Sequence, residues 1–133
     1  MKLLRDVAIR HLLTVDPNSS LVRAAKVMAD RGVGAAVVIE NEKVAGIVTE
    51  RDILKAIAND RDLGDTKVLD VMTRDVVSGA PAWDILKAVK TMSEGGFRHL
   101  LVMEMDDPVG IVSLRDLMDA MADVVQEDDS GSV

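Results

Sequence analysis

The chain has 133 residues, no cysteine and two histidines, and it carries a formal net charge of −7. The missing cysteines exclude disulfides, thiolate metal sites and cysteine nucleophiles, and only two histidines argue against a histidine-built metal site. The acidic charge opposes binding to nucleic acid or anionic membranes, and the hydrophobic residues, 48% of the chain, are spread through periodic segments rather than gathered into one membrane-spanning run.

These properties predict a globular protein long enough to bury a real hydrophobic core. The first residues lack the apolar stretch of a signal peptide, so we expect a cytoplasmic protein. Neither nucleic acid nor membrane is expected among its partners.

The pattern of the first half predicts six elements in this order: a helical lead-in at residues 3–9, a strand at 12–15, a helix at 20–31, two strands at 35–39 and 44–48, and a second helix at 49–59. Ser19 or Ser20 can cap the start of its first helix, and Gly32 fits the left-handed residue that ends it. The second half predicts the same order, with a lead-in at 68–73, strands at 76–78, 100–103 and 109–112, a first helix between Asp84 and Gly96, and a second helix at 113–125.

Apolar side chains are spaced to fit one face of each predicted helix. The first helices carry stripes formed by Leu21, Ala24, Ala25 and Met28 and by Ile85, Ala88, Val89 and Met92. On the second helices we expect six apolar residues to face inward: Ile53, Leu54, Ile57, Leu117, Met118 and Met121.

A heptapeptide repeat relates the two halves. Gly46-Ile47-Val48-Thr49-Glu50-Arg51-Asp52 returns 64 positions later as Gly110-Ile111-Val112-Ser113-Leu114-Arg115-Asp116. The same offset matches Pro17 with Pro81 without a gap, so the chain is a duplication. We assign residues 1–62 to the first repeat, 63–125 to the second, and 126–133 to an acidic tail that we expect to be disordered.

The predicted fold class is α+β, with two β-α-β-β-α units. A half of about 60 residues buries its core poorly alone, so we expect the two sheets to pack against each other about a pseudo-two-fold axis. Such packing would leave two equivalent clefts, each near the start of a second helix.

This order of elements, the duplicated motif and the lead-in Asp70-Val71-Met72-Thr73 resemble a tandem pair of CBS domains, a Bateman module. The resemblance covers residues 4–124. It implies a site between the repeats for an adenosine-containing ligand such as AMP, ADP, ATP, S-adenosylmethionine or NAD. It also implies frequent pairing of two modules into a homodimer.

The resemblance implies that Asp52 and Asp116 bind a ribose, and that Thr49 and Ser113 contact a phosphate at the positive end of a helix. The alternative is capping, because a hydroxyl residue followed three positions later by an acid also forms a helix cap. Both roles can coexist.

Basic residues near the second motif are further candidates. In nucleotide-binding members of the family, phosphates are often met by basic side chains at the position of Arg98 and His99, where the first repeat has Gly34 and Ala35. The alternatives are a surface arginine and a partly buried histidine bonded to a backbone carbonyl.

Four matches complete the candidate site. Arg51 and Arg115 are phosphate candidates, with an intrahelical ion pair as their alternative role. Thr14 and Ser78 fall more loosely where the family often contacts the purine. No cofactor is expected to be obligatory, although the two motif aspartates can hold Mg²⁺ together with a nucleotide.

Three classes of function are compatible with this pattern. The favoured one is a regulatory module that passes ligand binding to an unknown regulated protein through altered packing. The second is a structural dimerisation module with weak or empty sites. An enzyme is disfavoured, because the chain has no recognisable set of hydroxyl, base and acid.

Overall fold

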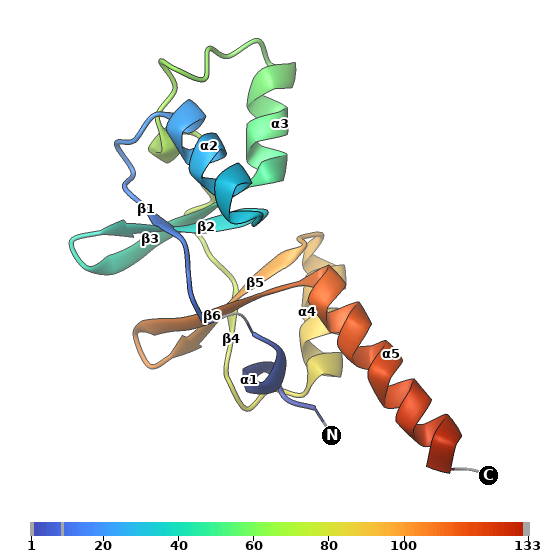
Figure 1. Cartoon of the computed structure of the whole chain (residues 1–133). Helices are drawn as coiled ribbons and strands as arrows, with labels where there is room; N and C mark the ends of the chain where they lie inside the picture. Colours follow the sequence, from blue (N-terminus) through green and yellow to red (C-terminus); the bar gives the residue numbers. More distant parts are fainter. Residues whose placement is uncertain (1, 9, 132–133) are drawn as a thin grey trace. The chain divides into compact units, whose positions relative to one another are not determined.

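The computed structural model describes residues 2–8 and 10–131, with side chains in its last helix described as far as Asp123. The elements, in chain order, are α1 (Leu4–Val7), β1 (Thr14–Val15), α2 (Leu21–Arg31), β2 (Ala35–Glu40), β3 (Lys43–Thr49), α3 (Glu50–Ala58), the 3₁₀ helix η1 (Val68–Asp70), β4 (Ser78–Gly79), α4 (Ile85–Gly95), β5 (His99–Glu104), β6 (Asp107–Ser113) and α5 (Leu114–Gly131) (Figure 1).

Each half forms a three-stranded sheet, in the order β1-β2-β3 and β4-β5-β6. The first strand of each sheet is parallel to the second, and the second and third form an antiparallel hairpin. The predicted α+β class and the β-α-β-β-α order are therefore confirmed. The sheet-to-sheet packing stays a prediction.

The first helix of each half packs its predicted stripe into the core. Leu21, Ala24 and Met28 are at most 3% exposed on α2, and the matching residues of α4 are equally buried. Ser20 Oγ accepts a hydrogen bond from the Arg23 amide at 3.2 Å. Gly32 ends α2 at φ 65°, where a side chain would be strained.

The chain divides into two compact units that differ from the sequence repeats. The first-repeat unit is Leu12–Val76, and the second-repeat unit is Met1–His11 with Val77–Val133. Each lead-in therefore belongs to the unit built by the other repeat. The division into repeats 1–62 and 63–125 stays a prediction about the sequence.

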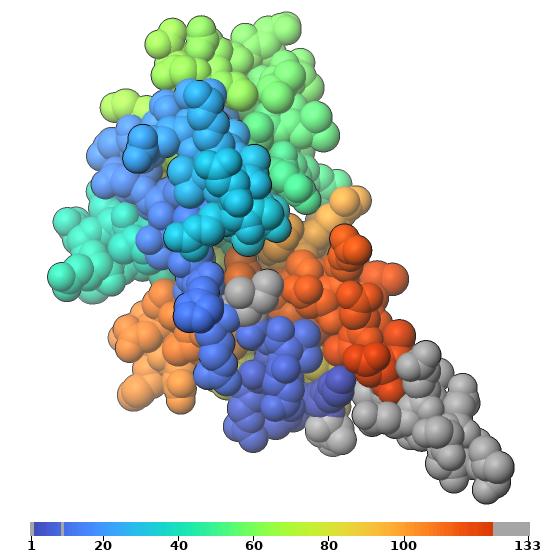
Figure 2. All heavy atoms as spheres, in the orientation of Figure 1, coloured from blue at the N-terminus to red at the C-terminus, as the bar shows by residue number. Residues whose placement is uncertain are grey.

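Backbone hydrogen bonds hold each lead-in in its unit at equivalent positions. The Leu4 amide donates to the Trp83 carbonyl at 2.9 Å, and the Val68 amide donates to the Ser19 carbonyl at 2.9 Å. Leu4 and Val68 are both fully buried. Figure 2 shows the atoms of α1 against those of α5, an element of the same unit.

The second helices differ from the prediction in which residues they bury. Leu54, Ile57 and Met118 are 66%, 54% and 60% exposed, so their predicted inward orientation is wrong. The inward orientation predicted for the other three residues is confirmed: Leu117 is buried, and Ile53 and Met121 pack partly buried against the two cores. Ala56 is buried as well. Neighbouring residues on a helix differ by about 100° in direction, so an apolar residue beside the buried stripe faces solvent.

Helix α5 extends beyond its predicted end near residue 125 and continues to Gly131. Glutamine and glutamate favour helix, and no glycine or proline interrupts the segment before Gly131. The predicted disorder of residues 126–133 stays a prediction. None of the described helices is long and apolar enough to cross a membrane.

Candidate functional site

The first motif lies at the junction of β3 and α3, where Thr49 is the N-cap residue. Its amide and its hydroxyl both donate to Asp52 Oδ2, at 2.8 and 3.1 Å, and the Asp52 amide donates back to Thr49 Oγ1 at 3.3 Å. The sequence alternative of a capping box is therefore present. These bonds orient the Asp52 carboxylate without any ligand.

The second motif repeats this arrangement between β6 and α5. The Ser113 amide donates to Asp116 Oδ2 at 3.1 Å, and the Asp116 amide donates to Ser113 Oγ at 3.0 Å. All four motif side chains are partly buried, so they remain accessible.

Each helix start is also joined to the beginning of the central strand of its sheet. The Leu114 amide donates to the Arg98 carbonyl at 2.8 Å, and His99 pairs with Ser113 across the ladder. The structure thus brings Arg98, His99, Ser113, Arg115 and Asp116 together within the second-repeat unit.

The first-repeat unit has the same backbone with small residues in place of the basic pair. The Glu50 amide donates to the Gly34 carbonyl at 2.9 Å, and Ala35 pairs with Thr49. Arg51 lies in the first turn of α3 and is exposed. Glu50 and Leu114 therefore lie beside the two candidate sites. The repeated heptapeptides contain both residues at matching positions, but neither was selected as a site candidate from the sequence.

Two amides at each helix start are already bonded within the unit. The amides of Glu50 and Leu114 donate to backbone carbonyls, and those of Asp52 and Asp116 donate to the cap hydroxyls. A phosphate at either helix start would compete with these bonds. Side chains therefore matter more for anion binding here than the helix amides do.

The two purine candidates lie on the opposite edge strand of their sheets from the motifs. Thr14 is on β1 and Ser78 on β4, whereas Thr49 and Ser113 end the third strands, with the central strand between. Strands two places apart are separated by about 10 Å. Within one unit, then, Thr14 and Ser78 are not in direct contact with the motif hydroxyls.

Among the described residues, no group of three or more His, Cys, Asp or Glu side chains could hold a metal ion. The first turn of α3 carries two carboxylates, Glu50 and Asp52, and the first turn of α5 carries one, Asp116. Any Mg²⁺ here would need oxygen ligands from a bound nucleotide.

A family model described as the CBS domain matches residues 4–59 and 68–123. The CBS domain-containing protein YhcV of Bacillus subtilis (strain 168) is 36% identical over 118 residues, which are 88% of this chain and 84% of YhcV. The crystal structure of the CBS-domain containing protein ATU1752 from Agrobacterium tumefaciens has a TM-score of 0.84 and 31% identity, and the match covers 90% of this chain and 92% of that one.

Two further structures of similar fold contain adenosyl ligands. The CBS domain pair of protein MJ0100, in complex with 5′-methylthioadenosine and S-adenosyl-L-methionine, has a TM-score of 0.84 and 23% identity over 92% of this chain and 97% of that one. The protein PAE2072 from Pyrobaculum aerophilum, complexed with AMP, has a TM-score of 0.79 and 23% identity over 86% and 89%. The two matches of the family model and the relative YhcV show that the chain belongs to the CBS-domain family and carries two CBS domains.

Proposed function

We propose that this protein is a non-catalytic regulatory module that binds an adenosine-containing ligand and signals its presence to a partner protein. The observation that carries the proposal is the pair of helix starts, each with an oriented aspartate and a cap hydroxyl. Complexes of similar fold with AMP and with S-adenosylmethionine support this class of ligand.

The aspartates are suited to a ribose because only one carboxylate oxygen takes part in the cap. Oδ2 of Asp52 accepts from Thr49, and Oδ2 of Asp116 accepts from Ser113. The other oxygen, Oδ1, can then accept hydrogen bonds from ribose hydroxyls. AMP, ADP, ATP, S-adenosylmethionine and NAD all carry this ribose, and the nucleotides can bring Mg²⁺ with them.

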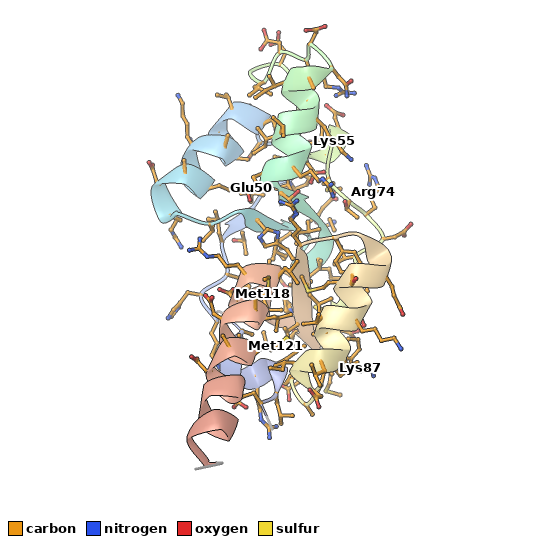
Figure 3. All side chains as sticks on the ribbon, turned by 90° about the vertical axis from the view of Figure 1, so that its right-hand side faces the viewer. Glu50, Lys55, Arg74, Lys87, Met118 and Met121 are labelled. Atoms are coloured by element: carbon orange, nitrogen blue, oxygen red, sulfur yellow. The ribbon has the colours of Figure 1, made fainter. Side chains whose placement is uncertain are left out.

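Signalling requires that the ligand binds one arrangement of the protein more tightly than another. We propose that ligand binding between the repeats changes the packing of a cytoplasmic homodimer, and that an as yet unknown protein responds to this change. Exposed apolar residues on the second helices suit such a dimer: Leu54, Ile57 and Met118. Figure 3 shows Met118 and Met121 along α5.

The test is calorimetric titration of ligand-free protein with AMP, ADP, ATP, S-adenosylmethionine and NAD, with and without Mg²⁺. We expect Asp116→Ala to weaken binding at its site by about 10-fold or more, because hydrogen bonds to a charged group are lost. The matched control is Asp119→Ala, an exposed acid on the same helix. Thermal melts of both variants show that they fold.

A structural dimerisation module is the second candidate, favoured by the same exposed apolar residues and by caps that are complete without a ligand. Sedimentation of the ligand-free protein separates the two functions. A stable dimer that binds none of the five compounds would support the scaffold and contradict the sensor.

A further inference from the structure

The two helix starts share one backbone arrangement but differ in charge. The start of α5 contains Arg115 and Asp116 and bonds to the backbone of Arg98, so these three residues carry a net charge of +1 when His99 is neutral. Beside α3 stand Glu50 and Asp52 with Arg51, a net charge of −1. Gly34, which takes the place of Arg98, bonds the α3 start through its carbonyl oxygen in the same way.

The first helical residue accounts for part of this charge difference. Glu50 is exposed at the N-terminus of α3, where a negative side chain interacts favourably with the helix dipole and so occupies the electrostatic role of a phosphate. Leu114 at the same position of α5 packs against the core of its unit. The positive end of α5 thus has no acid at its first residue.

The cap hydroxyls differ as well. Thr49 Oγ1 lies 3.1 Å from Asp52 Oδ2, so its proton is directed to the carboxylate. Among the described hydrogen bonds, Ser113 Oγ accepts from the Asp116 amide and does not donate to that carboxylate. The Ser113 hydroxyl is therefore the one that can donate a hydrogen bond to a phosphate oxygen.

We infer that the two sites select ligands of different charge. This inference rests on the proposed function. The α5 start takes an adenosyl ligand that bears a phosphate, and the α3 start takes an adenosyl ligand whose 5′ substituent is uncharged or cationic. The difference in charge and the difference in the cap hydroxyls act in the same direction, and local charges decide because solvent screens those beyond about 8 Å.

The experiment uses two full-length single-site proteins. Asp52→Asn keeps only the α5 site and Asp116→Asn only the α3 site, and in each the asparagine oxygen still accepts the cap bond. Titrations with AMP, adenosine and S-adenosylmethionine are compared. We expect the α5 site to bind AMP about 10-fold tighter than adenosine, and the α3 site to show the reverse order, because a charged hydrogen bond is gained in one site and a like charge is met in the other.

Substitutions at Arg98 and Glu50 then test whether these two charges cause the difference in ligand preference. In the Asp52→Asn protein, Arg98→Ala should weaken the binding of AMP by about 10-fold or more and change the affinity for adenosine by no more than about threefold. In the Asp116→Asn protein, Glu50→Leu should raise the affinity for AMP relative to adenosine by about fivefold. Exposed controls of the same charge are Lys90→Ala and Asp30→Asn.

The same order of ligands in both single-site proteins would overturn the inference while leaving the proposed function intact. So would AMP-to-adenosine ratios that Arg98→Ala and Glu50→Leu leave unchanged. If the unmodified protein binds none of the three compounds, the proposed function fails and the inference fails with it.

Discussion

At the scale of single residues, the two hairpin turns place different side chains at a first position with positive φ. Asn41 and Met105 occupy matching positions with φ of 52° and 57°. Asparagine tolerates this left-handed region, whereas methionine does so at a cost. Met105 is also 94% exposed, so packing does not compensate for that cost.

We predict that Met105→Asn raises the free energy of unfolding by about 0.5–1 kcal/mol, because the left-handed conformation is less strained in asparagine. Urea denaturation measures the change. The reciprocal variant Asn41→Met should lower stability by a similar amount. Equal stability of Met105→Asn and the parent protein would show that the turn tolerates methionine without strain.

At the scale of elements, helix α3 begins where strand β3 ends, and the second lead-in packs closely against this strand. In β3, Ile47 forms an antiparallel bridge with Thr73, with N to O distances of 3.0 and 2.9 Å. A Cβ added at Gly46 would lie 2.5 Å from the Thr73 carbonyl oxygen and 3.0 Å from Met72 Sδ. The glycine lets the second lead-in approach the strand.

We predict that Gly46→Ala lowers the free energy of unfolding by about 1–3 kcal/mol, because a backbone oxygen cannot move aside without breaking the bridge. Chemical denaturation measures this loss. The comparison is Gly64→Ala in an exposed loop, where the nearest atom is a side-chain oxygen of Asp62 at 3.2 Å. If the two variants lose the same stability, the close approach at Gly46 is not the cause.

At the scale of the whole molecule, each lead-in places an apolar residue in the core of the unit that the other repeat builds. Leu4 belongs to the core that contains Leu100 and Leu117, and Val68 belongs to the core that contains Leu21. Each unit therefore depends on a segment that the other repeat contributes.

We predict that Leu4→Ala destabilises the second-repeat unit by about 2–5 kcal/mol, the usual loss for a buried leucine. Hydrogen exchange should show lost protection in β5 and β6, while β2 and β3 keep theirs. Val68→Ala should give the opposite pattern. Lost protection in β2 and β3 of Leu4→Ala would mean that the first lead-in supports its own repeat instead.

Much of the site could be predicted because its determinants are local. A hydroxyl residue, an acid three positions later and an apolar strand before them predict the cap at Thr49 and at Ser113 from neighbouring residues alone. The orientation of Leu54 and Met118 could not be predicted, since an apolar residue one step from the buried stripe reads like a member of it. The roles of Glu50 and Leu114 appear only when strand pairing brings them beside residues 34 and 98.

By itself the sequence determined the duplication, the α+β order and the helix caps, because periodicity, turn chemistry and capping act over a few residues. Only the tertiary structure decided which core each lead-in enters. Leu4 and Val68 are both apolar and the two cores have matching residues, so either pairing satisfies the hydrophobic pattern equally. Backbone hydrogen bonds between segments about 50 to 80 residues apart select the exchanged pairing, and no local signal in the sequence records them.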